Sequence, residues 1–205
     1  MAALRPALWR PEPPLTVAAA VVVGGRDAGN RDQVPGWAAA VFRRGGVEVA
    51  RSVLEGAMGP PYVPALLAAR EGPLLAAAVA GLASRPDVLL LAATGRDHPR
   101  RAGLALHLGA VLDLPTLGVT DHPLLAAGPP PGPVRGDTSP LVLDGAEVAR
   151  WVRTAPGVRP VVAHAAWRTT AATAAEVVLA TATGVRTPQA LREARRLARE
   201  ARSAR

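Results

Sequence analysis

The residues best able to take part in chemistry lie in two segments of this sequence, PYVPALLAAREGP at positions 61–73 and PDVLLLAATGRDHPRR at positions 86–101. The first holds the carboxylate of Glu71 and the only tyrosine of the chain, Tyr62, which lies between prolines that stiffen the backbone. The second holds His98 beside two arginines, a group that could contact a phosphate or cap the start of a helix. The sequence contains no Gly-rich phosphate loop and no nucleophile elbow, so an enzyme built on either of those motifs has little support.

The elements that must position these segments follow from the hydrophobic pattern. Apolar, β-branched runs predict strands at positions 15–24, 37–43, 47–54, 87–93, 115–119, 141–143, 147–154 and 160–164. Helices are predicted at positions 65–83, 101–112, 169–183 and 188–204. This order of elements predicts an α/β fold, a ribonuclease H-like mixed sheet with helices on both faces.

Further motifs occur in a fixed order along the chain. They are VGGRD at positions 23–27, LALHLG at 104–109, PTLGV at 115–119 and GVRTP at 184–188. Together with the two segments above, they resemble the endonuclease V family of deoxyinosine-directed nucleases over roughly positions 15–196. The resemblance implies hydrolysis of a phosphodiester 3′ to deoxyinosine, or to inosine in RNA, with Mg²⁺ or Mn²⁺ as cofactor.

The resemblance also implies the site residues. It assigns the catalytic and metal-binding carboxylates to Asp27 and Glu71, and carboxylate oxygens are the ligands that Mg²⁺ prefers. Tyr62 would act as a wedge at the damaged base, although a residue that staples the start of the following helix is the alternative. The residues expected to contact nucleic acid are Pro61, Tyr62, Val63, Pro64, Gly95, His98, Arg100 and Gly118.

Three positions depart from the family pattern. Ala92 stands where the family has its second metal-binding aspartate, Asp121 where it has a lysine, and Trp167 where it has a histidine. Mutation of residues that only hydrogen-bond to metal ligands typically weakens metal binding ~10–100-fold, and loss of a ligand carboxylate itself should weaken it more. Asp121 ends the strand that should neighbour the strand of Ala92 in the sheet. With His122 beside it, its carboxylate could therefore replace the missing ligand, or it could serve only as a turn residue.

Two functions therefore follow from the sequence. One is a Mg²⁺-dependent endonuclease that acts on DNA or RNA containing a deaminated purine. The other is a catalytically impaired relative that binds nucleic acid or serves as an interaction module. Ala92 and Asp121 favour weak or absent nuclease activity within a family-like role in nucleic-acid repair.

Composition sets the remaining expectations. The 205 residues, 49% of them hydrophobic, favour one domain over positions 1–205, with an irregular segment at 1–14, a Pro/Gly-rich loop at 126–140 and a basic C-terminal helix at 188–205. Without cysteine there is no disulfide, and the apolar run at 15–25 is too short to cross a bilayer, so we expect a cytoplasmic monomer. Of the net charge of +8, seven arginines and two glutamates from position 186 onward contribute +5. This terminal helix is either a phosphate-binding surface or a solvated face.

Overall fold

The protein is described here by a computed structural model, which describes residues 6–24, 34–61 and 63–204. An eight-stranded mixed sheet has the order β3-β2-β1-β4-β5-β8-β7-β6. The strands are β1 (Thr16–Gly24), β2 (Pro35–Arg44), β3 (Val47–Ala57), β4 (Val88–Leu91), β5 (Thr116–Thr120), β6 (Thr138–Leu143), β7 (Ala146–Val152) and β8 (Val161–Ala165). The helices are α1 (Leu67–Ala80), α2 (Leu104–Leu112), α3 (Ala171–Thr181) and α4 (Gln189–Ser203).

The centre of the sheet is parallel and its two sides are antiparallel. β4 pairs in parallel with both β1 and β5, whereas β2 and β3 form an antiparallel meander with β1. β8, β7 and β6 continue the sheet beyond β5 in antiparallel order. The continuous apolar sequences of the central strands are explained by helices on both faces, because such strands are buried on either side.

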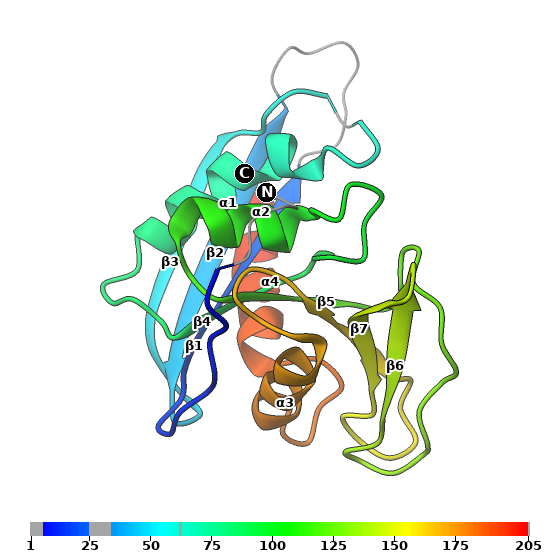
Figure 1. Cartoon of the computed structure of the whole chain (residues 1–205). Coiled ribbons are helices and arrows are strands. Elements are labelled where there is room, and N and C mark those ends of the chain that lie inside the picture. The colour runs from blue at the N-terminus through cyan, green and yellow to red at the C-terminus, as the bar shows by residue number, and fades with distance from the viewer. Residues whose placement is uncertain (1–5, 25–33, 62, 205) are drawn as a thin grey trace.

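Helices cover both faces of this centre, as Figure 1 shows, with α1 and α2 on the near face and α4 behind. Along β4, Leu89 and Leu91 pack on the side of α1 and α2, and Val88 and Leu90 pack on the side of α3 and α4. This alternation is the period of two expected of a strand with two buried faces. The predicted ribonuclease H-like arrangement, with helices on both faces, is confirmed.

Several element boundaries differ from the prediction. The helix expected at 101–112 begins only at Leu104, because residues 95–103 form an irregular connection whose backbone bonds back to β8, as in the Arg96 N–H to Ala165 oxygen bond. The helix expected at 65–83 is α1, which tolerates Pro73 on an exposed side. The loop expected at 126–140 is irregular up to Asp137 except for one bridge, from Ala127 to Val142.

Among the described residues, no helix is both long enough and apolar enough to cross a membrane.

Candidate nucleic-acid and metal site

A cavity of about 200 Å³ opens where β4 and β5 end. The carboxyl ends of parallel strands meet at one edge of a sheet, and ligands of α/β proteins commonly bind at that edge. The residues that line the cavity are Ala92, Val119, Thr120, Asp121, Val161, Thr187, Leu191 and Arg195. The cavity thus combines the end of β4, the end of β5 and the first half of α4.

Ala92 and Asp121, two of the three altered positions of the sequence, lie in this same cavity. Ala92 follows the last residue of β4 and is exposed, so β4 offers the cavity a methyl group in place of an oxygen ligand. Asp121 follows the last residue of β5. The sequence prediction that these two positions neighbour each other across parallel strands is therefore confirmed.

The carboxylate of Asp121 is held by an arginine. Arg186 Nη1 donates to Asp121 Oδ1 over 2.5 Å, and this hydrogen bond lowers the pKa of the Asp121 carboxyl. The other donors of Arg186 bond to the carbonyl oxygens of Arg159 and Pro160, at 2.9 and 3.0 Å. Asp121 is thus ionised and its charge is balanced by a fixed partner.

The described lining of the cavity does not fit a divalent cation. Mg²⁺ needs several hard oxygen ligands, whereas the described lining supplies one carboxylate, already paired with Arg186, and one guanidinium, that of Arg195. Across the described chain, no group of three or more His, Asp and Glu side chains could hold a metal ion. The role of Asp121 as a replacement ligand stays a prediction.

Of the two family carboxylates, only Glu71 belongs to the described residues; Asp27 lies outside them. Glu71 lies in the first half of α1 and is partly buried. Burial raises the pKa of its carboxyl to about 7, and the nearby Arg70 acts in the opposite direction. Such a shift is typical of functional carboxylates, but the pairing of Glu71 with Asp27 at a metal stays a prediction.

The predicted wedge lies in the irregular connection between β3 and α1. Pro61, Val63 and Pro64 are exposed there, and Tyr62 lies outside the described residues. The backbone of Ala65, directly after this segment, has a positive φ of 64°. The exposed segment is accessible to a partner, and its role as a wedge stays a prediction.

The structure gives the glycines and His98 a packing role. A Cβ at Gly95 would lie 2.1 Å from the carbonyl oxygen of Ala165, so only glycine fits there. His98 is buried, and its Nδ1 accepts the backbone N–H of Arg100 at 3.2 Å. Burial lowers the pKa of His98. The alternative prediction, that His98 caps the start of the following helix, is wrong, because His98 lies six residues before the first residue of α2. The predicted contacts of Gly95, His98, Arg100 and Gly118 with nucleic acid remain predictions.

A buried polar network behind the cavity was missed by the sequence reasoning. Asp97 is fully buried and accepts the backbone N–H groups of Leu124, Leu125 and Ala126 at 2.7 to 2.9 Å. It thereby fixes the connection that follows β5 and Asp121. Only the close spacing of Asp97 and His98 after a buried strand could have suggested this network.

His164 of β8 joins that network to the cavity wall. Its Nε2 lies 2.7 Å from the hydroxyl of Thr120, and its Nδ1 lies 3.7 Å from Asp97 Oδ2. The Thr120 hydroxyl donates to the His122 carbonyl, so the ring hydrogen is assigned to His164 Nε2. Burial lowers the pKa of His164 to about 4, which leaves the ring neutral at pH 7.

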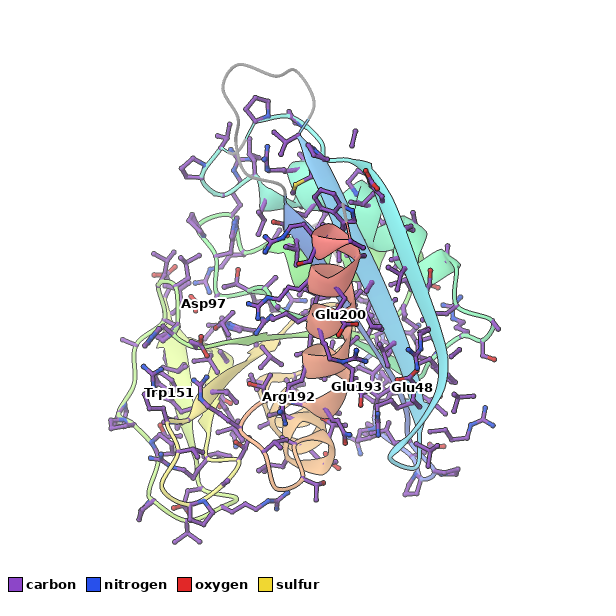
Figure 2. All side chains as sticks on the ribbon, turned by 180° about the vertical axis from the view of Figure 1, so that it is seen from behind. Glu48, Asp97, Trp151, Arg192, Glu193 and Glu200 are labelled. Carbon is purple, nitrogen blue, oxygen red and sulfur yellow. The ribbon has the colours of Figure 1, made fainter. Side chains whose placement is uncertain are left out.

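The basic C-terminal helix packs one face on the sheet and turns another toward an open groove. Ala190, Leu191, Ala194, Leu197 and Ala198 form the buried face of α4. The groove, of about 740 Å³, is lined by Val185, Arg186, Thr187, Arg192, Arg195, Arg196, Arg199, Glu200 and Ser203. Figure 2 looks onto α4, with Arg192 on one side of the helix and Glu193, which pairs with Arg43 of β2 at 2.6 Å, on the other.

The fold and this site define the class of the protein. A mixed sheet with parallel β1, β4 and β5, an antiparallel β2–β3 hairpin and helices on both faces is the ribonuclease H-like nuclease fold. A family model described as endonuclease V matches residues 11–196. The chain belongs to the endonuclease V family.

Similar proteins agree with this assignment. An endonuclease V of Roseiflexus castenholzii is 42% identical over 142 residues, which are 69% of this chain and 64% of that protein. The chain therefore spans just under two thirds of that curated relative. The crystal structure of endonuclease V from Streptomyces avermitilis has a TM-score of 0.87 at 36% identity and covers 96% of this chain and 86% of its own.

A more distant likeness concerns the fold. Endonuclease V of Ciona intestinalis, in complex with a 23mer DNA that contains an inosine followed by a ribo-adenosine, has a TM-score of 0.75 at 23% identity, covering 92% of this chain and 86% of its own.

Proposed function

We propose that this protein acts in nucleic-acid repair by binding DNA or RNA that contains a deaminated purine, and that its hydrolysis of the phosphodiester 3′ to that base is weak or absent. Membership of the endonuclease V family supports the substrate class. The cavity at the ends of β4 and β5 supports the weak hydrolysis, because Ala92 and Arg195 line it and the only carboxylate among its described lining residues, that of Asp121, is paired with Arg186.

Chemistry explains why this cavity decides the activity. In a metal-dependent nuclease the ion supplies an activated water and offsets charge on the phosphoryl oxygens. The residues of this chain that would hold Mg²⁺ or Mn²⁺ are Asp27, which lies outside the described residues, and Glu71, which is not among the described residues that line the cavity. Two carboxylates without a third form a weak site.

A second candidate is Mg²⁺-dependent hydrolysis through Asp27, Glu71 and Asp121. The observation in its favour is the raised pKa of Glu71, since carboxylates with shifted pKa values cluster at functional sites. It requires Asp121 to leave Arg186.

A nicking assay on a labelled duplex with one deoxyinosine separates the two candidates. The duplex is incubated with Mg²⁺ and then with Mn²⁺, and the same protein is tested for a mobility shift against an undamaged duplex. We expect a preferential shift of the deoxyinosine duplex with little or no nicking. The variant Ala92→Asp should raise nicking by at least ~10-fold, because it restores the carboxylate that the family carries at this position.

The result against this proposal is efficient nicking by the parent protein that Asp27→Ala abolishes. It would mean that the metal site is complete with a different set of ligands. A parent that neither nicks nor prefers the deoxyinosine duplex would refute the substrate class as well.

A further inference from the structure

Arg195 brings a positive charge to the place where a nuclease of this fold needs a positive ion. It lines the cavity together with Ala92, although the two residues lie about 100 positions apart in the sequence. No salt bridge joins Arg195 to any acid of the described chain, whereas Arg186 and Arg196 each have an acidic partner. A partly buried guanidinium without an acidic partner can accept an anion without first breaking an ion pair.

The rest of the cavity also suits an anion. The Asp121 carboxylate is balanced by Arg186, whose three guanidinium nitrogens each donate a hydrogen bond, one to Asp121 and two to backbone carbonyl oxygens. Thr187 adds a hydroxyl group to the lining, and Ala92 leaves room that an aspartate would fill. A volume of about 200 Å³ exceeds the ~30 Å³ of one water several-fold, which is ample space for a phosphate group.

The groove along α4 continues this cavity. Thr187 and Arg195 line both, so the two spaces share a wall. Arg192, Arg195, Arg196 and Arg199 recur at the i, i+3, i+4 and i+7 spacing that places side chains on one helix face. From 192 to 199 the helix rises about 10 Å, which is long enough for its arginines to contact more than one phosphate of a strand.

We propose that the cavity binds a phosphate oxyanion directly through Arg195, without a divalent ion, and that the arginines of the groove bind the neighbouring phosphates of the same nucleic-acid strand. The guanidinium occupies the electrostatic role that a metal has in catalytic relatives, but it cannot activate a water. The proposal rests on the proposed function, whose nucleic acid is the partner, and it predicts that this chain binds the nucleic-acid backbone without a metal ion. Arginine suits this role because its planar donors match two phosphate oxygens at once.

Titration with inorganic phosphate in the presence of EDTA tests the cavity alone. Binding is followed by calorimetry and by the amide signals of Thr120 and Thr187. It is measured in the parent, in Arg195→Gln and in the control Arg51→Gln, which changes an exposed arginine of β3. We expect Arg195→Gln to weaken phosphate binding by ~10-fold or more and the control to leave it unchanged. Ala92→Asp should weaken it too, because a carboxylate would pair with Arg195 and fill the cavity. This second variant keeps the arginine and its packing.

Titration with a single-stranded oligonucleotide, also in EDTA, tests the groove. The double variant Arg192→Gln with Arg199→Gln should leave phosphate binding unchanged but weaken oligonucleotide binding and lower the slope of log affinity against log salt by about 1.4, or 0.7 for each lost contact. Equal phosphate binding by the parent and Arg195→Gln would overturn the proposal for the cavity. Equal oligonucleotide binding by the parent and the double variant would overturn it for the groove and leave α4 as a solvated face.

The phosphate and oligonucleotide titrations also distinguish the anion site from the proposed binding of deaminated purines. Phosphate and oligonucleotide binding without preference for deoxyinosine would support the anion site and refute the substrate class. A deoxyinosine preference with no phosphate binding in EDTA would support the substrate class and refute the anion site.

Discussion

The neutral, buried His164 predicts an acid-sensitive stability that a single substitution should remove. Burial lowers the pKa of this ring from its ordinary value of 6.5 to about 4, and the Asp97 carboxylate acts in the opposite direction. The unfolded chain therefore binds a proton at a pH where the folded protein does not. Stability from this group is fully present above pH 6.5 and is lost as the pH falls through about 4.

The size of the effect follows from the shift. A difference of about 2.5 pKa units corresponds to about 3 kcal/mol at 1.36 kcal/mol per unit. In the same range the raised pKa of Glu71 acts with opposite sign, because a carboxyl with a raised pKa in the folded state stabilises it as the pH falls from 7 to 4.5. The parent curve alone would hide part of the His164 effect, so the difference between parent and variant is the quantity to measure.

The assay is urea unfolding between pH 4 and 8 for the parent and for His164→Gln. We expect the stability advantage of the parent over the variant to shrink by about 3 kcal/mol between pH 7 and pH 4. NMR titration of the ring should show no protonation of His164 above pH 5. A difference that does not change with pH, or one that His107→Gln on α2 reproduces, would refute the reasoning.

Three further predictions concern the surrounding site. Asp97→Asn should cost about 2–4 kcal/mol of unfolding free energy in denaturant titration, because an amide cannot accept all three backbone N–H bonds that the carboxylate accepts; an unchanged midpoint would contradict this network. Gly118→Ala should cost about 1–3 kcal/mol and lower Tm, since its Cβ would lie 2.0 Å from the carbonyl oxygen of Ala93; a stable variant that loses only nucleic-acid binding would favour the contact role instead. The raised pKa of Glu71 should make the folded protein lose stability as the pH rises from 4.5 to 7, and Glu71→Gln should abolish this loss. The measurement is the unfolding free energy at the two pH values, and a loss that persists in the variant would exclude Glu71 as its source.

The fold was predictable because the local and global patterns agree. Continuous apolar runs at β4 and β5, separated by helix-forming segments, already specify central parallel strands. The neighbourhood of Ala92 and Asp121 followed from the same reasoning, because adjacent parallel strands end at one edge.

The contents of the cavity were less predictable, because they depend on contacts between distant positions. Arg186 reaches Asp121 across 65 residues, and Arg195 reaches the end of β4 only because α4 packs on β1 and β2. From the sequence, the terminal arginines indicated a charged face but not which of them would enter a cavity. The link between Asp97 and His164 likewise depends on how residues 95–103 turn back along β8.

The position of α4 on β1 has a consequence for synthesis of the chain. The face of β1 that carries Val17, Ala19 and Val21 is covered by residues of α4, which begins 165 residues after β1 ends, from 24 to 189. At about 5–20 residues per second, a ribosome needs roughly 10–30 s to make the covering helix after it has made the strand. During that interval an apolar strand surface is exposed on the nascent chain, so chaperone contact should concentrate on β1 and end when α4 emerges.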